Sequence, residues 1–264
     1  MLNINNIRYC VDENAILFPD HNLKMILVPL HSSSSETSSL ALTAETAFLY
    51  EDRWRASKSV TAQRILSRLG VFRRVHARLC KVVSLQNCKD NGLSPDAFHS
   101  KAKKFLDAFH TYGHLKGQTD YLLMYKGDTI AAAQFMKTYS KEENAYEWTR
   151  YASLPDVRIA GGMGKVLEQF IRDVRPCFEI MSYSDNEWGD GDAYRKLRFH
   201  LNGSLPPVTY RIDPATYKRI NPRQWAQMMK ASKKLRAEEY PLIQNQGSRK
   251  WVLRLSDGVP GLRG

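Results

Sequence analysis

The chain has 264 residues, of which 43% are hydrophobic and 25% charged, values typical of a globular protein with one large domain or two small ones. No stretch approaches the roughly 18 consecutive apolar residues of a membrane helix, and the N-terminus lacks a basic segment followed by an apolar core, so we expect neither a membrane span nor a secretion signal. The formal net charge of +12 favours a polyanionic partner, most often a nucleic acid. The four cysteines form no Cys-x-x-Cys pair, which favours free thiols in a reducing compartment, the cytoplasm, over a zinc site.

The first 50 residues contain short β-like runs separated by turn residues. The runs cover residues 8–11 and 23–28, Pro, Asp, His and Asn lie between them at 19–22, and a serine-rich stretch follows at 31–39. Apolar runs bounded by such residues are typical of strands joined by turns. The sequence therefore predicts short strands followed by a loop.

A strongly basic segment comes next. Residues 53–81 hold nine Lys or Arg residues and no acid: Arg53, Arg55, Lys58, Arg64, Arg68, Arg73, Arg74, Arg78 and Lys81. Apolar residues recur among them at helical spacing, at Ile65, Leu66, Leu69 and Phe72. This predicts a helical region with a basic side and a break at Gly70, and the basic side fits either a solvated face or a phosphate-contacting face. The interleaved Trp54 and His76 favour phosphate contact, so seven residues are predicted to bind nucleic acid: Arg53, Arg55, Lys58, Arg64, Arg73, Arg74 and Arg78.

The middle of the chain alternates between helical and β patterns. Ser94 and Pro95 predict the start of a helix that runs to residue 109. Runs at 121–125 and 129–135 flank a Lys-Gly-Asp turn and predict a β-hairpin, and a third strand is predicted at 145–152. His110 and His114 have the spacing of a helical metal pair, but no Glu follows the first His, so solvated histidines at a helix end are the better interpretation and no metal site is predicted.

A glycine-rich turn runs directly into an amphipathic helix at residues 157–170. Gly161, Gly162 and Gly164 allow close approach of the backbone, while the free N–H groups and the dipole of the first helical turn attract anions. Glycines before a helix also occur as plain turn residues, and the spacing alone does not exclude that interpretation.

Beyond the glycine turn, an apolar run at 177–181 leads to a helical segment that carries Tyr194, Leu197 and Phe199. This order of elements resembles the GNAT fold of acyl-CoA-dependent acetyltransferases. The resemblance implies that Gly162-Met163-Gly164 binds the pyrophosphate of acetyl-CoA or another acyl-CoA, and that Tyr194 protonates the departing thiolate. It extends the set of cofactor-binding residues to Arg158, Ile159, Gly161, Gly162, Met163, Gly164 and Lys165. The chain departs from the family where Ile159 takes the place of Arg or Gln and where Arg198 replaces the glycine of Leu-Gly-Phe.

Most of the chain resembles phage and mobile-element proteins in which a nuclease-like segment precedes a GNAT-like domain. The similar stretches are residues 49–54, 76–80, 161–165, 182–188, 191–194 and 250–251. In those relatives an upstream strand supplies metal-binding carboxylates, whereas the comparable strand here, 25–29, has no acid. Asp12, Asp20, Glu51 and Asp52 remain, but two-metal cleavage needs its acids to converge on the ions. We therefore expect a shortened, inactive nuclease-like segment.

The GNAT-like part also resembles, more distantly, the Mom family of phage DNA-modification proteins. This resemblance implies acyl transfer onto a base, which needs a group that takes the proton of the amine and one that protonates the leaving group. Glu147 is the predicted base, although a cross-strand salt bridge fits it equally well, and Asp185 is the second choice. Tyr194 is the predicted acid, although a core tyrosine fits the same spacing, and Trp188 fits either base stacking or packing against the sheet.

The prediction as a whole is an α/β protein with a GNAT-like mixed, mostly antiparallel sheet flanked by helices. Its expected parts are a degenerate nuclease-like segment (1–52), a basic helical region (53–93), the acyltransferase core (94–212) and a basic C-terminal extension (213–264). The predicted function is acyl transfer to DNA or tRNA from an acyl-CoA or related donor, without a membrane partner. An inactive nucleic-acid-binding accessory protein is the alternative, and a metal-dependent nuclease is the third.

Overall fold

The computed structural model describes residues 7–30, 46–138, 145–232 and 234–255. The predicted loop at 31–39 lies outside them. The chain divides into two compact units, the first formed by residues 1–62, 184–193 and 202–250 and the second by residues 63–183, 194–201 and 251–264. No helix within the described ranges is both long and apolar enough to cross a membrane.

The first unit contains a four-stranded and a three-stranded sheet among its described residues. The order β1-β2-β3-β4 places β1 Cys10–Asp12, β2 Ala15–Phe18, β3 Leu23–Val28 and β4 Thr46–Tyr50 side by side, with β3 and β4 parallel. The order β14-β13-β15 joins β13 Thr209–Ile212, β14 Arg219–Ile220 and β15 Leu242–Gln244. Helices α1 Glu51–Ala56 and α6 Pro222–Ala231 and the 3-10 turns η2 Pro19–His21 and η5 Ala237–Glu239 complete the regular elements of this unit. Apolar side chains of β3 and β4 share a core with Ile212 and Ile243, so both sheets belong to one packed body.

The elements of the second unit are β5 Arg73–His76, η3 Ala77–Leu79, β6 Lys81–Ser84, η4 Lys89–Asn91, α3 Pro95–Phe109, β7 Thr119–Tyr125, β8 Asp128–Lys137, β9 Tyr146–Ser153, β10 Val157–Ala160 and α4 Gly162–Val174. The remaining elements include residues assigned to both units: α2 Lys58–Arg68, β11 Glu179–Asp185, α5 Asp192–Lys196, β12 His200–Leu205 and β16 Ser248–Arg254.

A seven-stranded sheet of described residues has the order β12-β16-β11-β9-β8-β7-β6. Strands β6 to β9 pair antiparallel, and β11 joins β9 in parallel. The strand β6 lies upstream of residue 94, where the acyltransferase core was predicted to begin.

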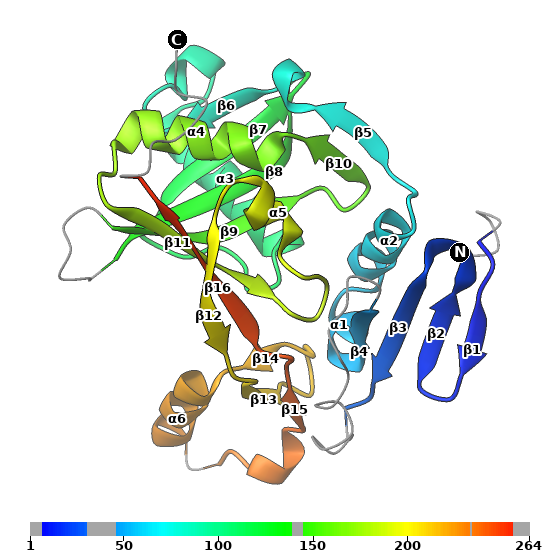
Figure 1. Ribbon diagram of the computed structural model, residues 1–264. Helices are drawn as coiled ribbons and strands as arrows, with labels where there is room; N and C mark the ends of the chain where they lie inside the picture. Colours follow the sequence, from blue (N-terminus) through cyan, green and yellow to red (C-terminus); the bar gives the residue numbers. More distant parts are fainter. Residues whose placement is uncertain (1–6, 31–45, 139–144, 233, 256–264) are drawn as a thin grey trace. The chain divides into compact units, whose positions relative to one another are not determined.

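Helices α3 and α4 cover opposite faces of this sheet (Figure 1). Side chains alternate along β7, so Tyr121 and Leu123 join the cluster that holds α4, while Leu122 joins the cluster that holds α3. Phe170 of α4 stacks on Phe135 with ring centroids 3.9 Å apart. The predicted mixed α/β fold with a helix-flanked sheet is confirmed.

Local signals in the sequence placed several of these elements correctly. The Ser94 side chain accepts a hydrogen bond from the Ala97 amide at the start of α3. The predicted hairpin is β7 and β8, and the predicted third strand is β9. These elements depend on a cap, a turn and an alternating pattern, all of which are local.

The predicted break at Gly70 is present, but the predicted continuation of the helix beyond it is wrong. Gly70 has a φ of +85° and ends α2, because the amides of Gly70 and Val71 bond back to the carbonyls of Ser67 and Leu66. The segment then becomes the strand β5, which pairs in parallel with β10.

Candidate active site around the glycine turn and Tyr194

The glycine turn lies between β10 and α4, as the pattern predicted. Gly161 is the N-cap of α4 and has a φ of +77°. A Cβ on Gly162 would lie 2.8 Å from Ile159 Cγ2 and 3.0 Å from the Tyr151 hydroxyl. The second glycine is therefore required by close packing. The amides of the first α4 turn have no partners within the helix, which makes this end attractive to an anion.

Lys165, predicted to bind the cofactor, forms hydrogen bonds within the protein. Its ammonium donates to the carbonyl oxygens of Ala77 and Cys80, at 3.0 and 2.6 Å. Lys165 thus fixes the η3 turn against the first turn of α4.

The side chains before the turn divide between core and surface. Ile159 and Met163 pack against the core cluster beneath α4. Arg158 is exposed, and its guanidinium carbon lies 4.3 Å from the centre of the Phe72 ring. The parallel register pairs Arg158 with Arg74, so both arginines stand on the same outer face of the β5–β10 ribbon.

Strands β9 and β11 pair over only three residues. The last pair is Trp148 with Ser182, and beyond it no register between the two described strands continues. The register of β8 with β9 shifts at the same place, so that Thr149 forms a β-bulge. A bulge beside diverging strands frees backbone groups of β9 from regular pairing.

The Tyr194 hydroxyl lies at this point of divergence. It is 2.9 Å from Ser182 Oγ, which donates its own proton to the Trp148 carbonyl at 2.8 Å. With the Ser182 proton donated to Trp148, the described acceptors within reach of the Tyr194 hydroxyl are Ser182 Oγ and the Tyr183 carbonyl oxygen at 3.4 Å. Burial raises the pKa of Tyr194 above its ordinary value of 10, so the hydroxyl stays protonated at neutral pH.

The Tyr194 ring is held by aromatic neighbours. It stacks on Trp251 at 5.9 Å with an interplanar angle of 12° and makes an edge contact with Phe199 at 5.6 Å. The Phe199 amide also donates to the Tyr194 carbonyl at 3.0 Å, which closes the end of α5. The ring of Tyr194 is thus packed against the core, while its hydroxyl lies where the strands separate; its role as an acid stays a prediction.

Glu147 lies on the α3 face of the sheet, whereas the next residue, Trp148, lies on the α4 face. It pairs across β8 with Met136, and Arg150, after the bulge, pairs with Gln134 on that same face. Burial raises the pKa of Tyr183, and the nearby carboxylate of Glu147 raises it further. Glu147 therefore stands beside the divergence on the side away from α4.

Asp185, the second predicted base, belongs to the first unit. Its Oδ1 accepts the Glu187 amide at 2.7 Å, and its charge contributes to raising the pKa of Glu187.

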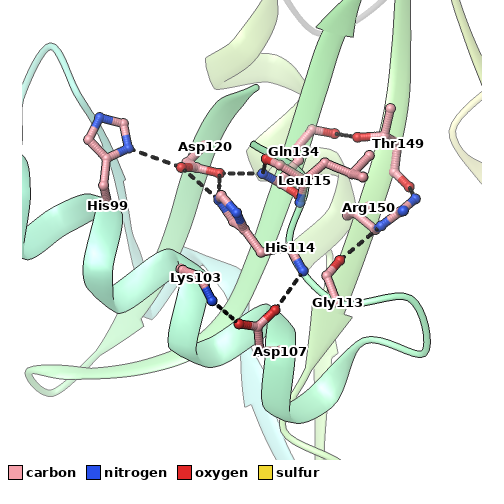
Figure 2. Close-up of polar contacts among 10 residues, drawn as sticks. All are labelled: His99, Lys103, Asp107, Gly113, His114, Leu115, Asp120, Gln134, Thr149 and Arg150. Atoms are coloured by element: carbon pink, nitrogen blue, oxygen red, sulfur yellow. Dashed lines mark hydrogen bonds and ion pairs between the residues drawn. The ribbon is translucent and has the colours of Figure 1, made fainter. Parts of the chain in front are cut away.

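A buried polar network anchors Arg150 to the connection between α3 and β7 (Figure 2). The Arg150 Nε donates to the Gly113 carbonyl at 3.0 Å, and its Nη1 donates to the Thr149 carbonyl at 2.7 Å. Asp120, which is buried, accepts from Gln134 at 2.8 Å and lies 3.1 Å from His99 Nδ1 and 3.2 Å from His114 Nε2. His114 thus bonds to a buried carboxylate, which corrects the expectation of a solvated histidine. This network was not predicted, because its members are separated by loops whose folding no local pattern indicates.

The residues predicted to bind nucleic acid do not form one helical face. Arg53, Arg55 and Lys58 are in the first unit and the others in the second. Arg55 pairs with Glu51 at 2.7 Å, Arg53 lies 3.9 Å from Asp52, and Arg64 donates to the Phe109 carbonyl. The exposed members of the second unit are Arg73, Arg74 and Arg78, on β5 and η3 rather than on a helix.

Three of the four acids considered for nuclease activity, Asp20, Glu51 and Asp52, have other hydrogen-bond partners in the first unit. Asp20 pairs with Arg8, and Glu51 accepts the Leu30 amide at 3.0 Å. Asp52 is fully buried and accepts two hydrogen bonds from Arg219, which also donates to Glu187 at 2.6 Å.

No family model and no curated protein sequence matches the chain. Among solved structures, it is similar to the ribosomal-protein-S18-alanine N-acetyltransferase from Escherichia coli, with a TM-score of 0.41, 13% identity and coverage of 70% of this chain and 99% of that chain. It is also similar to a GNAT family acetyltransferase from Elizabethkingia anophelis with acetyl-CoA bound, with a TM-score of 0.37, 12% identity and coverage of 67% and 99%. A third similar structure is the spermidine/spermine N-acetyltransferase from Vibrio cholerae, with a TM-score of 0.36, 9% identity and coverage of 68% and 96%.

Proposed function

We propose that the chain is an N-acyltransferase that takes its acyl group from acetyl-CoA or another acyl-CoA. The observation that carries the proposal is the Tyr194 hydroxyl, which is protonated and hydrogen-bonded at the residues where β9 and β11 stop pairing. A proton donor fixed at a gap in backbone pairing is what departure of a thiolate requires.

The glycine turn fits the phosphates of such a donor. A Cβ on Gly162 would clash with Ile159 and Tyr151, and one on Gly164 would lie 3.3 Å from Leu197, so packing keeps both positions free of side chains. The bare backbone of this turn lets a phosphate reach the first-turn amides of α4, and Arg74 and Arg158 add positive charge nearby. A bound acyl-CoA would supply the activated acyl group.

The two proton transfers are assigned to two side chains on opposite faces of the sheet, Tyr194 and Glu147. Tyr194 holds its proton on the α4 side, where the donor's sulfur would leave. Glu147, on the α3 side, takes the proton of the attacking amine, directly or through water. The backbone N–H groups released at the Thr149 bulge polarise the acyl carbonyl. The pH-rate profile then depends on an ionised Glu147 and a protonated Tyr194.

We further propose a nucleic acid, DNA or tRNA, as the acceptor. The net charge of +12 supports a polyanionic partner, and Arg73, Arg74 and Arg78 are exposed on the unit that carries Tyr194.

The test begins with calorimetric titration of acetyl-CoA into the purified protein after removal of nucleic acid at high salt. Gly161→Asp and Gly161→Asn form a matched pair, because Asp and Asn both tolerate positive φ and a Cβ there would meet only Ala77 at 3.6 Å. We expect the Asp variant to bind about tenfold more weakly than the Asn variant, since only Asp adds a negative charge.

Catalysis is tested with Tyr194→Phe, which keeps the stacked ring and removes the hydroxyl. Turnover with radiolabelled acetyl-CoA and DNA or tRNA should fall about 100-fold or more, with donor affinity unchanged. Donor binding with no acylation of any acceptor, or no donor binding at millimolar concentration, would contradict the proposal and favour a nucleic-acid-binding accessory protein.

A further inference from the structure

Arg150 lies on β9 directly after the Thr149 bulge and is held by two backbone carbonyls (Figure 2). Its Nε donates to the Gly113 carbonyl at 3.0 Å, and its Nη1 donates to the Thr149 carbonyl at 2.7 Å. Its guanidinium carbon also lies 5.7 Å from the centre of the Tyr112 ring. These contacts fix both the position and the direction of a half-buried guanidinium.

Among the described residues, no carboxylate forms an ion pair with Arg150. The strand register places Asp120, Gln134 and Arg150 next to one another across β7, β8 and β9. The Asp120 carboxylate interacts with Gln134, His99 and His114, and Gln134 lies between it and Arg150. The Nη2 group of Arg150 donates no hydrogen bond to any residue that the structure describes. A half-buried cation with a free pair of N–H donors is suited to an anionic ligand.

Glu147, the proposed base, lies on the same face of β9 just before the bulge. Burial lowers the pKa of Arg150, whereas Glu147 and Tyr112 raise it, and a guanidinium stays protonated at neutral pH in any case. Glu147 acts in the same way on Tyr183, whose pKa is raised first by burial and then by this carboxylate. The group that would take the amine proton therefore lies near both Arg150 and Tyr183.

Two exposed tyrosines belong to this side of the sheet. Tyr112, which contacts Arg150, is 46% exposed, and Tyr183 is 36% exposed. Because Ser182 faces Tyr194, the alternation along β11 places the Tyr183 side chain on the opposite face, the one that carries Arg150. The Tyr183 carbonyl oxygen is nevertheless 3.4 Å from the Tyr194 hydroxyl. The α3 side of the candidate site thus combines a fixed cation with two exposed aromatic rings.

We propose that Arg150 binds the phosphate of the nucleotide whose base is acylated. This role rests on the proposed function, because the base of the same nucleotide would present its amine to Glu147. The Nη2 group offers two N–H donors to phosphate oxygens in charge-assisted hydrogen bonds. A carboxylate would satisfy the same cation, but the exposed rings of Tyr112 and Tyr183 favour a nucleotide, since aromatic side chains stack on bases.

The test compares nucleoside monophosphates with the nucleosides that lack the phosphate, by NMR titration of the full chain. The pairs are AMP and adenosine, CMP and cytidine, and GMP and guanosine, whose bases carry amino groups. We expect the wild type to bind at least one monophosphate about tenfold more tightly than its nucleoside. Arg150→Met should bind both members of that pair equally. Arg150→Lys should keep part of the preference, since it retains the charge but not the planar fork.

Two further variants separate phosphate binding from a structural role. Tyr112→Leu leaves both hydrogen bonds of Arg150 in place and removes a ring, so it should weaken nucleoside and monophosphate binding by the same factor. Lys104→Met removes an exposed positive charge from α3 and should change neither affinity. If Arg150 were purely structural, Arg150→Met and Arg150→Lys would weaken both ligands alike and leave the phosphate preference intact.

An unchanged phosphate preference in Arg150→Met would overturn the proposal. So would a wild type that binds acetyl-CoA but prefers no monophosphate, a result that leaves the acyltransferase standing. Acetylation of α-amino acids that is lost in Arg150→Met would also overturn it, because the guanidinium would then bind a carboxylate. A phosphate preference that depends on Arg150, in a protein that binds no acetyl-CoA, would support the phosphate site and refute the acyltransferase.

Discussion

Replacing Arg219 by Met is expected to destabilise the first unit severely. Arg219 donates from Nε to Asp52 Oδ2 at 2.8 Å, from Nη2 to Asp52 Oδ1 at 3.3 Å and from Nη1 to Glu187 Oε1 at 2.6 Å. The three side chains are at most 2% exposed, so water cannot replace the lost donors. Removing one partner of a buried ion pair costs about 3 to 5 kcal/mol, because the remaining carboxylates stay buried without their cation.

The size of the loss should depend on pH. Burial, with a smaller effect of Asp185, raises the pKa of Glu187 from 4.5 to about 7, while Arg219 lowers it. Because the folded-state pKa is above the unfolded one, the stability from this group is full below about pH 4.5 and is lost as pH rises through 7. Without Arg219 the pKa rises further, and the loss continues above pH 7. The destabilisation should therefore be larger at pH 8 than at pH 5.

Urea denaturation followed by circular dichroism at both pH values measures this effect. Arg55→Met is the control, because Arg55 is exposed and its pair with the half-buried Glu51 should be worth less than about 1 kcal/mol; the variant also removes a hydrogen bond to the Tyr217 hydroxyl. Adding Asp52→Asn and Glu187→Gln to Arg219→Met should recover part of the lost stability, since neutral amides cost less to bury. A loss below about 1 kcal/mol, an equal loss at both pH values, or no recovery in the triple variant would refute the reasoning.

Two further predictions concern the second unit and the thiols. Lys165→Met should lower the free energy of unfolding by about 2 to 3 kcal/mol, because two carbonyls lose a charged donor. It should also speed hydrogen exchange in the η3 segment. Unchanged exchange in that segment would contradict this prediction. Cys10 and Cys177 are exposed, whereas Cys80 and Cys88 are buried and burial raises the pKa of the Cys80 thiol. Iodoacetamide should therefore modify the exposed pair in the native protein and the buried pair only in urea, as peptide mass spectrometry would show; rapid native labelling of Cys80 would argue against the packing around it.

Short-range signals in the sequence determined much of the second unit. The cap at Ser94, the turn between β7 and β8 and the glycines before α4 each depend on a few neighbouring residues, and each predicted element is present. Tyr194 was singled out by the resemblance of the segment with Tyr194, Leu197 and Phe199 to the GNAT fold, and not by any local pattern alone.

Only the tertiary structure decided the use of the charged residues. Composition showed that the segment after residue 53 is basic, but not that strand β5 follows the break at Gly70 or that Lys165 binds two carbonyls 88 and 85 residues away. Asp52 and Arg219 are 167 residues apart, and no local pattern relates them. A buried charge needs a partner, but the partner is chosen by the path of the chain, which is set by sheet order and packing rather than by sequence neighbours.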